Sequence, residues 1–192
     1  MFSSNWFEKL AKDNFENIIK PIYREIDKIN YLEIGCFEGA SLTYMFKNVL
    51  THNESTATVI DPFIFYENQY NCFNENIKPY MNQINLKKGY SQNILPTLTY
   101  DYFDLIYIDG DHTSEGVFND AILSFPLLKK NGIIIFDDYL WRYDGEHTIV
   151  STDDINLNHP NNPFSGINQF LDMHKDKIEI IKQNWQMIIK KL

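Results

Sequence analysis

Five side chains that could bind a cation or move a proton follow two apolar runs in the middle of the sequence. The run FDLIYI at 103–108 is followed by Asp109, Asp111 and His112, and the run GIIIF at 132–136 by Asp137 and Asp138. Both runs are rich in Ile and Phe with little polar alternation, which is typical of strands in a parallel sheet covered on both faces. Four carboxylates held close together repel one another unless a cation lies among them or some keep their protons. The pattern therefore predicts a divalent-metal and catalytic cluster.

The segment between these runs supplies the crossover that would bring the five side chains together. Residues 114–130 place Val117, Ile122, Phe125 and Leu128 at helical spacing, and Asn131-Gly132 is a pair that favours a helix end. A right-handed strand–helix–strand unit makes the two strands parallel, so that both carboxyl ends open on the same edge of the sheet. We therefore expect the five side chains at one edge.

The remaining segments complete an alternating pattern of strands and helices. The expected elements are helices at 5–29 broken at Pro21, a strand at 31–34, a helix at 40–50, a strand at 56–61, short helices at 63–83, a strand at 84–88, a short helix at 91–98, a helix at 164–174 and a hairpin in 178–192. This order predicts an α/β fold: a Rossmann-like, doubly wound, mainly parallel sheet of seven strands with an antiparallel last strand and helices on both faces.

Length and charge limit the classes of protein that fit. The 192 residues are expected to form one domain over 1–192, with N-terminal helices at 1–29 and a lid or substrate loop at 142–163. The net charge of -9, without a basic cluster, argues against a nucleic-acid partner. No apolar run is long enough to span a membrane and no signal peptide is evident, so a cytoplasmic location is expected. The apolar face of the N-terminal helices could cover the sheet or form a homo-oligomer.

A glycine turn follows the first predicted strand. In YLEIGCFEGAS, at 31–41, Gly35 and Gly39 lie between a strand and the start of a helix, where a ligand can approach the backbone closely. Phe37 occupies the place of the second glycine in a dinucleotide fingerprint, which disfavours a pyrophosphate on this turn. Asp61 ends the next strand, where it could accept hydrogen bonds from ribose hydroxyls or serve as a turn residue.

Five segments in this order resemble the class I S-adenosylmethionine-dependent methyltransferases, and in particular the small metal-dependent O-methyltransferase-like proteins with an IDGDH motif. The segments are YLEIGCFEGAS, VIDPF, GYSQNILPTL, DLIYIDGDHTSEGVFND and GIIIFDDY. The resemblance covers nearly the whole chain. It implies methyl transfer from S-adenosylmethionine, assisted by Mg²⁺ or another divalent cation.

The resemblance also implies roles for individual residues. Glu33, Gly35 and Gly39 would hold the methionine end of the cofactor, with Ser41 near its carboxylate, Asp61 on the ribose, Ser91 beside the adenine, and Asp109 in the same pocket. Asp109, Asp137 and Asp138 would be the metal ligands. Asp111 is the first candidate for the catalytic base, because an extended turn would point it the same way as Asp109, and His112 is the second.

Three functions remain open at this point. The first is methyl transfer from S-adenosylmethionine, for which a small hydroxylated molecule, with sugars ahead of phenols, is the expected acceptor. Asp109-Gly110-Asp111 also satisfies the Asp-x-Asp pattern of metal-dependent nucleotide-sugar glycosyltransferases. A catalytically silent module that keeps the cofactor fold as a binding surface is the third reading.

Overall fold

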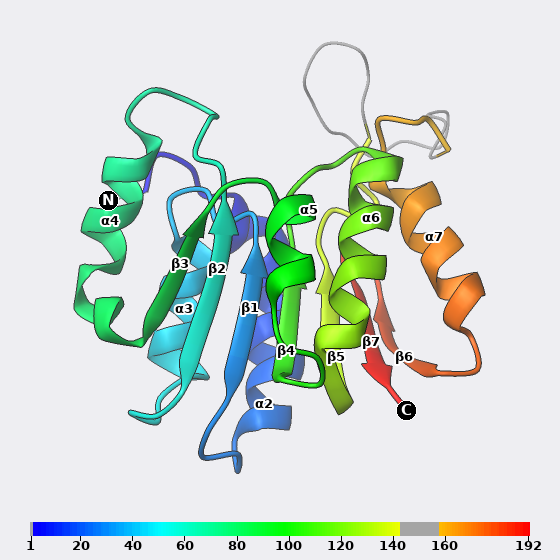
Figure 1. Cartoon of the computed structure of the whole chain (residues 1–192), viewed down its shortest axis with the longest axis horizontal. Coiled ribbons are helices and arrows are strands. Elements are labelled where there is room, and N and C mark those ends of the chain that lie inside the picture. Colours follow the sequence, from blue (N-terminus) through cyan, green and yellow to red (C-terminus); the bar gives the residue numbers. More distant parts are fainter. Residues whose placement is uncertain (1, 143–157) are drawn as a thin grey trace.

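One seven-stranded sheet organises the chain in the computed structural model, which describes residues 2–142 and 158–192 (Figure 1). Its strand order is β3-β2-β1-β4-β5-β7-β6. Six strands run in the same direction, and β7 runs in the opposite direction between β5 and β6. The strands are β1 (Asn30–Ile34), β2 (Thr56–Asp61), β3 (Ile84–Lys88), β4 (Phe103–Ile108), β5 (Leu128–Phe136), β6 (Ile178–Gln183) and β7 (Met187–Lys191). The strand order reverses between β1 and β4, which is where open α/β sheets bind ligands.

Helices cover both faces of the sheet, as expected for buried parallel strands. The N-terminal run comprises η1 (Phe7–Ala11), α1 (Lys12–Asn14), η2 (Phe15–Ile19) and α2 (Lys20–Tyr23), and it shares one face with α3 (Ala40–Asn48), α4 (Gln69–Ile77) and the short η3 (Lys78–Gln83). The other face carries α5 (Ser91–Ile94), η4 (Leu95–Thr97), α6 (Ser114–Ser124), η5 (Phe125–Leu127) and α7 (Pro163–His174). Phe15 and Ile19 of the N-terminal run are fully buried against the chain's own sheet.

Two predicted boundaries are wrong for reasons that involve proline. The helix after β4 ends at Ser124 rather than Lys130, because Pro126 lacks the backbone N–H that the next α-helical hydrogen bond needs, and the chain continues as the 3-10 turn η5 to Leu127. Asn131, with φ 65°, therefore lies at an irregularity of β5 instead of ending a helix. The N-terminal helix is not broken at Pro21; it passes through a π-helical segment just before that residue and ends at Tyr23.

Two further observations concern the outlying segments. The predicted loop 142–163 falls mostly outside the described residues, which resume at residue 158 and lead into α7. None of the helices in the described parts of the chain combines the length and the apolar character needed to cross a bilayer.

Candidate active site

At the centre of the sheet, the last residues of β1, β4 and β5 pair with one another, so that these three strands end in register. Ile34 of β1 pairs with Ile108 of β4, and Ile108 pairs with Phe136 of β5. The next residues extend this pairing, since the amide of Asp109 donates to Ile34 at 2.8 Å and the amide of Asp137 donates to Ile108 at 2.9 Å. Both aspartates thus occupy the first position beyond the ladder. The expectation that the two apolar strands open on one edge is confirmed.

The turn after β1 can be built only with glycine at its first position. Gly35 has φ 81°, and a Cβ there would lie 2.0 Å from the carbonyl oxygen of Asp109. Gly39, also at φ 81°, precedes the first residue of α3, and a Cβ there would lie 2.8 Å from Ile77. The backbone of the turn, which carries no side chain at Gly35, therefore packs directly against Asp109, the residue that begins the acidic cluster.

Substituting Gly35 with Ala should destabilise the protein by more than about 2 kcal/mol, because the methyl group meets backbone atoms and the positive φ is unfavourable for alanine. Urea unfolding of the purified variant measures this change. Gly110→Ala is the matched control, since its Cβ would lie 3.3 Å from the nearest side-chain atoms. Equal stability of the two variants would contradict the geometry of this turn.

Glu33 and Ser41 lie beneath the turn and contact each other. The hydroxyls of Ser41 and Tyr31 both donate to the Glu33 carboxylate, the latter at 2.8 Å, and Glu33 is fully buried. Burial raises the pKa of Glu33 to about 7, partly offset by these two hydrogen bonds. The hydrogen bond joins Glu33 of β1 to Ser41 of α3, so both residues stabilise the glycine turn that connects these two elements.

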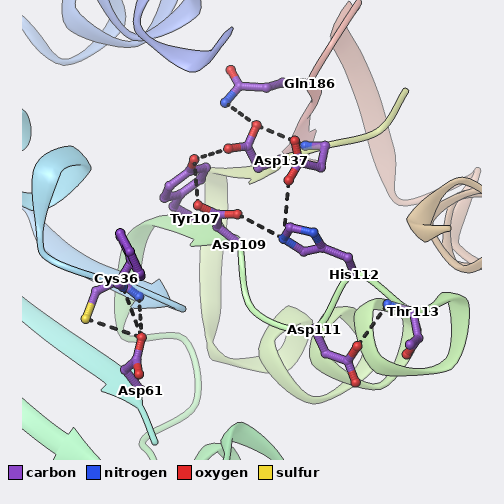
Figure 2. Close-up of polar contacts among 11 residues, drawn as sticks. Cys36, Asp61, Tyr107, Asp109, Asp111, His112, Thr113, Asp137 and Gln186 are labelled. Atoms are coloured by element: carbon purple, nitrogen blue, oxygen red, sulfur yellow. Dashed lines mark hydrogen bonds and ion pairs between the residues drawn. The ribbon is translucent and has the colours of Figure 1, made fainter. Parts of the chain in front are cut away.

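Asp61 clamps the same turn from the end of β2. Its Oδ2 accepts hydrogen bonds from the amides of Cys36 and Phe37, each at 3.0 Å, and its Oδ1 accepts one from the amide of Phe63 at 2.6 Å. Figure 2 shows this carboxylate beneath Cys36. Asp61 is thus tied to the loop that it was expected to flank, and contact with a ribose would use its remaining lone pairs.

Ser91, at the start of α5, has a partner that the sequence analysis missed. Its hydroxyl favours the charged form of the Asp120 carboxylate in α6, which is buried, although the pair lacks the geometry of a full hydrogen bond. Burial raises the pKa of Asp120 to about 6, partly offset by Ser91. A signal was present in the sequence, because Asp120 lies three residues after Val117 on the apolar face of its helix.

Asp109, His112 and Asp138 form the core of the cluster, and Figure 2 labels the first two. The Nε2 atom of His112 lies 3.6 Å from Oδ1 of Asp109 and 3.2 Å from Oδ2 of Asp138. One ligand atom from each of the three residues can be chosen so that all lie within 4.8 Å of one another. The rings of Trp141 and His112 form a T-shaped pair, with ring centroids 5.2 Å apart. This cluster has the donor atoms and spacing of a cation site.

Mutual repulsion and burial shift the pKa of every member of the cluster. Burial and then Asp137 raise the pKa of Asp138 to about 7, and the same two causes raise that of Asp109 well above its usual range. For His112, burial alone would lower the pKa, but Asp109 and Asp138 outweigh it and raise the pKa to about 9. Without a bound cation, protons therefore supply the positive charge that the cluster needs.

Asp137 lies beside this group and is occupied by protein donors. Its Oδ1 accepts from Gln186 Nε2 and from the Asp138 amide, both at 2.9 Å, and its Oδ2 accepts from the Tyr107 hydroxyl. The same hydroxyl oxygen lies 3.3 Å from Oδ2 of Asp109. Tyr107 could have been suspected from the sequence, because it lies two residues before Asp109 and so on the same side of β4.

Asp111 points away from the cluster, so the expected extended turn is wrong. Its Oδ1 accepts from the amide of Thr113, the N-cap of α6, at 2.9 Å, and its carboxylate lies over Gly116 (Figure 2). The start of a helix attracts a carboxylate through unpaired N–H groups and the helix dipole. Of the two candidate bases, only His112 lies in the cluster.

A separate hollow at the opposite edge of the sheet does not compete with this site. It has a volume of about 460 Å³ and is lined by residues such as Thr56, Thr58, Asn85 and Tyr102. Its lining contains no acid, histidine, lysine or arginine. The cluster of titratable side chains described above lies instead at the carboxyl edge of the sheet.

Comparison with known proteins identifies relatives of the chain. A family model described as a methyltransferase domain matches residues 32–139, more than half of the chain. An uncharacterised protein of Acanthamoeba polyphaga mimivirus is 36% identical over 122 residues, which are 60% of this chain and 53% of the relative. The chain thus spans about half the length of the curated relative it matches.

Solved structures share the fold at low identity. The O-methyltransferase TomG of Streptomyces achromogenes, involved in tomaymycin synthesis and solved with S-adenosylmethionine, gives a TM-score of 0.66 at 13% identity, covering 99% of this chain and 91% of that chain. An O-methyltransferase from Bacillus cereus, solved with S-adenosylhomocysteine, gives 0.64 at 15% identity, covering 100% and 93%. The predicted fold class is confirmed.

Proposed function

This chain belongs to the methyltransferase domain family, and from that premise we propose that it transfers the methyl group of S-adenosylmethionine to a hydroxyl oxygen of a small molecule. One observation carries the proposal. The glycine turn after β1 touches the backbone of Asp109, so a ligand on the turn would lie beside the cluster of Asp109, His112 and Asp138. A methyl donor and a group that activates a hydroxyl need that adjacency.

The residues of the turn fit the cofactor. Gly35 and Gly39, both at φ 81°, allow the turn to pack closely against Asp109 and against Ile77, and the amides at the start of α3 are available to a carboxylate. Asp61 would orient the ribose while holding the turn, and Ser91 with Asp120 would flank the adenine. S-adenosylmethionine, when bound, supplies an electrophilic methyl group on a sulfonium.

The cluster fits a divalent cation by the chemistry of its donors. Asp109 and Asp138 offer carboxylate oxygens, which suit Mg²⁺ and Mn²⁺. Such a cation, when bound, lowers the pKa of an acceptor hydroxyl. Asp137 keeps its carboxylate on Tyr107 and Gln186 beside this site.

His112 is the proposed base, ahead of Asp111. Its ring is half-buried at the cluster and contacts both carboxylates, whereas the carboxylate of Asp111 is held by the amide of Thr113. A cation bound by Asp109 and Asp138 would offset the carboxylate charges that raise the pKa of His112, which would leave the imidazole neutral and able to take the hydroxyl proton as the methyl group is transferred. Trp141 would fix the ring in place.

Calorimetric titration separates this function from its rivals. Binding of S-adenosylhomocysteine is expected, and binding of a UDP-sugar instead would favour the glycosyltransferase. The divergence of Asp109 and Asp111 argues against the latter, because their carboxylates do not share a site. Binding of neither compound would favour a silent module. The sugar-like acceptor, homo-oligomerisation, the absence of a nucleic-acid partner and the cytoplasmic location stay predictions.

Asp61→Ala should weaken S-adenosylhomocysteine binding by about tenfold or more, because charge-assisted hydrogen bonds to the turn and the ribose are each worth about 1.5–3 kcal/mol. Calorimetry measures the change. Asp172→Ala, an exposed acid in α7, is the control and should bind normally. Unchanged affinity in folded Asp61→Ala would mean that the cofactor does not lie on this turn.

A further inference from the structure

The tip of the β6–β7 hairpin reaches the acidic cluster. Because β7 is antiparallel to β5, it begins at the edge where β5 ends, and Met187 pairs with Phe136. Gln186, at 0% exposure, donates from Nε2 to Asp137 Oδ1 at 2.9 Å (Figure 2). The indole N–H of Trp185 faces Asp138 and favours its charged form, although it lacks the geometry of a full hydrogen bond. The tip thus contributes side chains to both aspartates that follow β5.

Asn14 of the N-terminal helix sets the direction of the Gln186 amide. Asn14 is buried, and its Nδ2 donates to Gln186 Oε1 and to Asn184 Oδ1, both at 2.9 Å. Asn184 returns a hydrogen bond from its Nδ2 to Asn14 Oδ1 at 3.1 Å. Because the oxygen of Gln186 accepts from Asn14, its NH₂ group must face Asp137. The amide of Gln186 therefore has one satisfied orientation.

Asp137 transmits this constraint to Asp138. The backbone of Asp138 is left-handed, with φ 53°, which a residue other than glycine adopts only at a cost. Its amide donates to the same Oδ1 of Asp137 that Gln186 holds, and its carbonyl accepts from the amide of Trp141 at 2.8 Å. In this conformation the Asp138 carboxylate reaches His112.

We propose that Gln186 and Asn14 are positioning residues of the active site. They hold the carboxylate of Asp137, which maintains the left-handed backbone of Asp138 and so directs the Asp138 carboxylate to His112 and Asp109. The spacing of the cation site is then set by a hairpin tip and a helix that do not touch the cation. Where it concerns the cation, this inference rests on the proposed function; where it concerns the backbone of Asp138, it does not.

Gln186→Met tests the proposal, because it keeps the length of the side chain and removes the amide. The control is Gln83→Met, since the Gln83 side chain also makes two hydrogen bonds, in which Nε2 donates to the carbonyls of His52 and Ser55, but at the far edge of the sheet. Amide hydrogen exchange at Asp138, followed by NMR without metal, should accelerate by roughly tenfold in Gln186→Met and should be unchanged in Gln83→Met. Mn²⁺ affinity, measured by electron paramagnetic resonance, should fall by roughly 10–100-fold in Gln186→Met.

Asn14→Leu guards against a folding defect in the first variant. It leaves Gln186 in place and removes the donor that orients it, so a smaller change in both measurements is expected. If Asp138 exchanges in both variants as in the unaltered protein, the inference is overturned, whatever Mn²⁺ does. If the unaltered protein binds no Mn²⁺ while the exchange effect is present, the positioning role stands and the cation in the proposed function falls. Faster exchange with unchanged Mn²⁺ affinity would overturn the link between the hairpin and the cation site.

Discussion

Replacing His112 with Gln should lower kcat by about 10²–10⁴-fold, the usual contribution of a general base. The imidazole is the only one of the two candidate bases that contacts the cluster, with Nε2 at 3.2 Å from Asp138 and 3.6 Å from Asp109. Affinity for S-adenosylhomocysteine should stay nearly constant, because His112 lies beyond the turn that would hold the cofactor. Steady-state kinetics with an acceptor found among hydroxylated small molecules measures the first quantity, and calorimetry the second.

Asp111→Asn is the matched control for this experiment. It alters the neighbouring residue of the same turn, but the carboxylate concerned serves the amide of Thr113 at the start of α6. Only a small rate change is expected. A collapsed rate in Asp111→Asn together with normal turnover in His112→Gln would assign proton transfer to the aspartate and would mean that the turn rearranges when ligands bind.

Mn²⁺ should raise the melting temperature of the protein more at about pH 8.5 than at about pH 6, a difference that follows from the protons it must displace. The pKa of Asp138 is raised from 3.8 to about 7, chiefly by burial and Asp137, and that of His112 from 6.5 to about 9 by its carboxylate neighbours against the effect of burial. Because both pKa values are higher in the folded protein than in the unfolded chain, the folded protein holds these protons more tightly and is stabilised at low pH. This stabilisation is lost as pH rises through the folded-state pKa values of about 7 and then about 9.

Two effects therefore act in the same direction as pH rises. The cation-free protein loses stability because the carboxylates lose their protons, and the cation meets less competition at Asp138. Differential scanning calorimetry across this pH range, with and without Mn²⁺, measures the combined effect. Asp138→Ala should remove most of the Mn²⁺-dependent shift at the higher pH. A shift that is equal at both pH values, or that survives Asp138→Ala, would place the cation elsewhere.

Much of the fold could be predicted because its signals are local. The bounds of β2 and β3 match the predicted ones, since each strand is a short run between clear turn residues. The helix after β4 extends in the prediction to Lys130 because apolar spacing continues past Ser124, whereas the missing N–H of Pro126 decides where it ends. Periodicity describes which residues are buried, but it does not locate the last hydrogen bond of a helix.

Strand topology predicted which residues share the site, but it did not predict where every side chain points. A shared edge for Asp109, His112 and Asp138 follows from parallel strands. The direction of Asp111 did not, because the amides at the start of α6 draw its carboxylate away from the strand. Gln186 was missed because it acts on Asp137 from 49 residues away along the chain and only through the pairing of β7 with β5.

The hydrogen bond between Asn14 and Gln186 joins residues 172 positions apart. During synthesis, β1 to β5 and the helices between them leave the ribosome before β7 does, whereas a domain generally folds as a unit. The contact that orients the Gln186 amide is therefore among the last to form, because long-range contacts follow local ones. Until β7 is in place, Asp137 lacks the hydrogen bond that Gln186 donates to it. The acidic cluster therefore reaches its described geometry only once β7 has joined the sheet, and a cation that needs this geometry would bind only after that step.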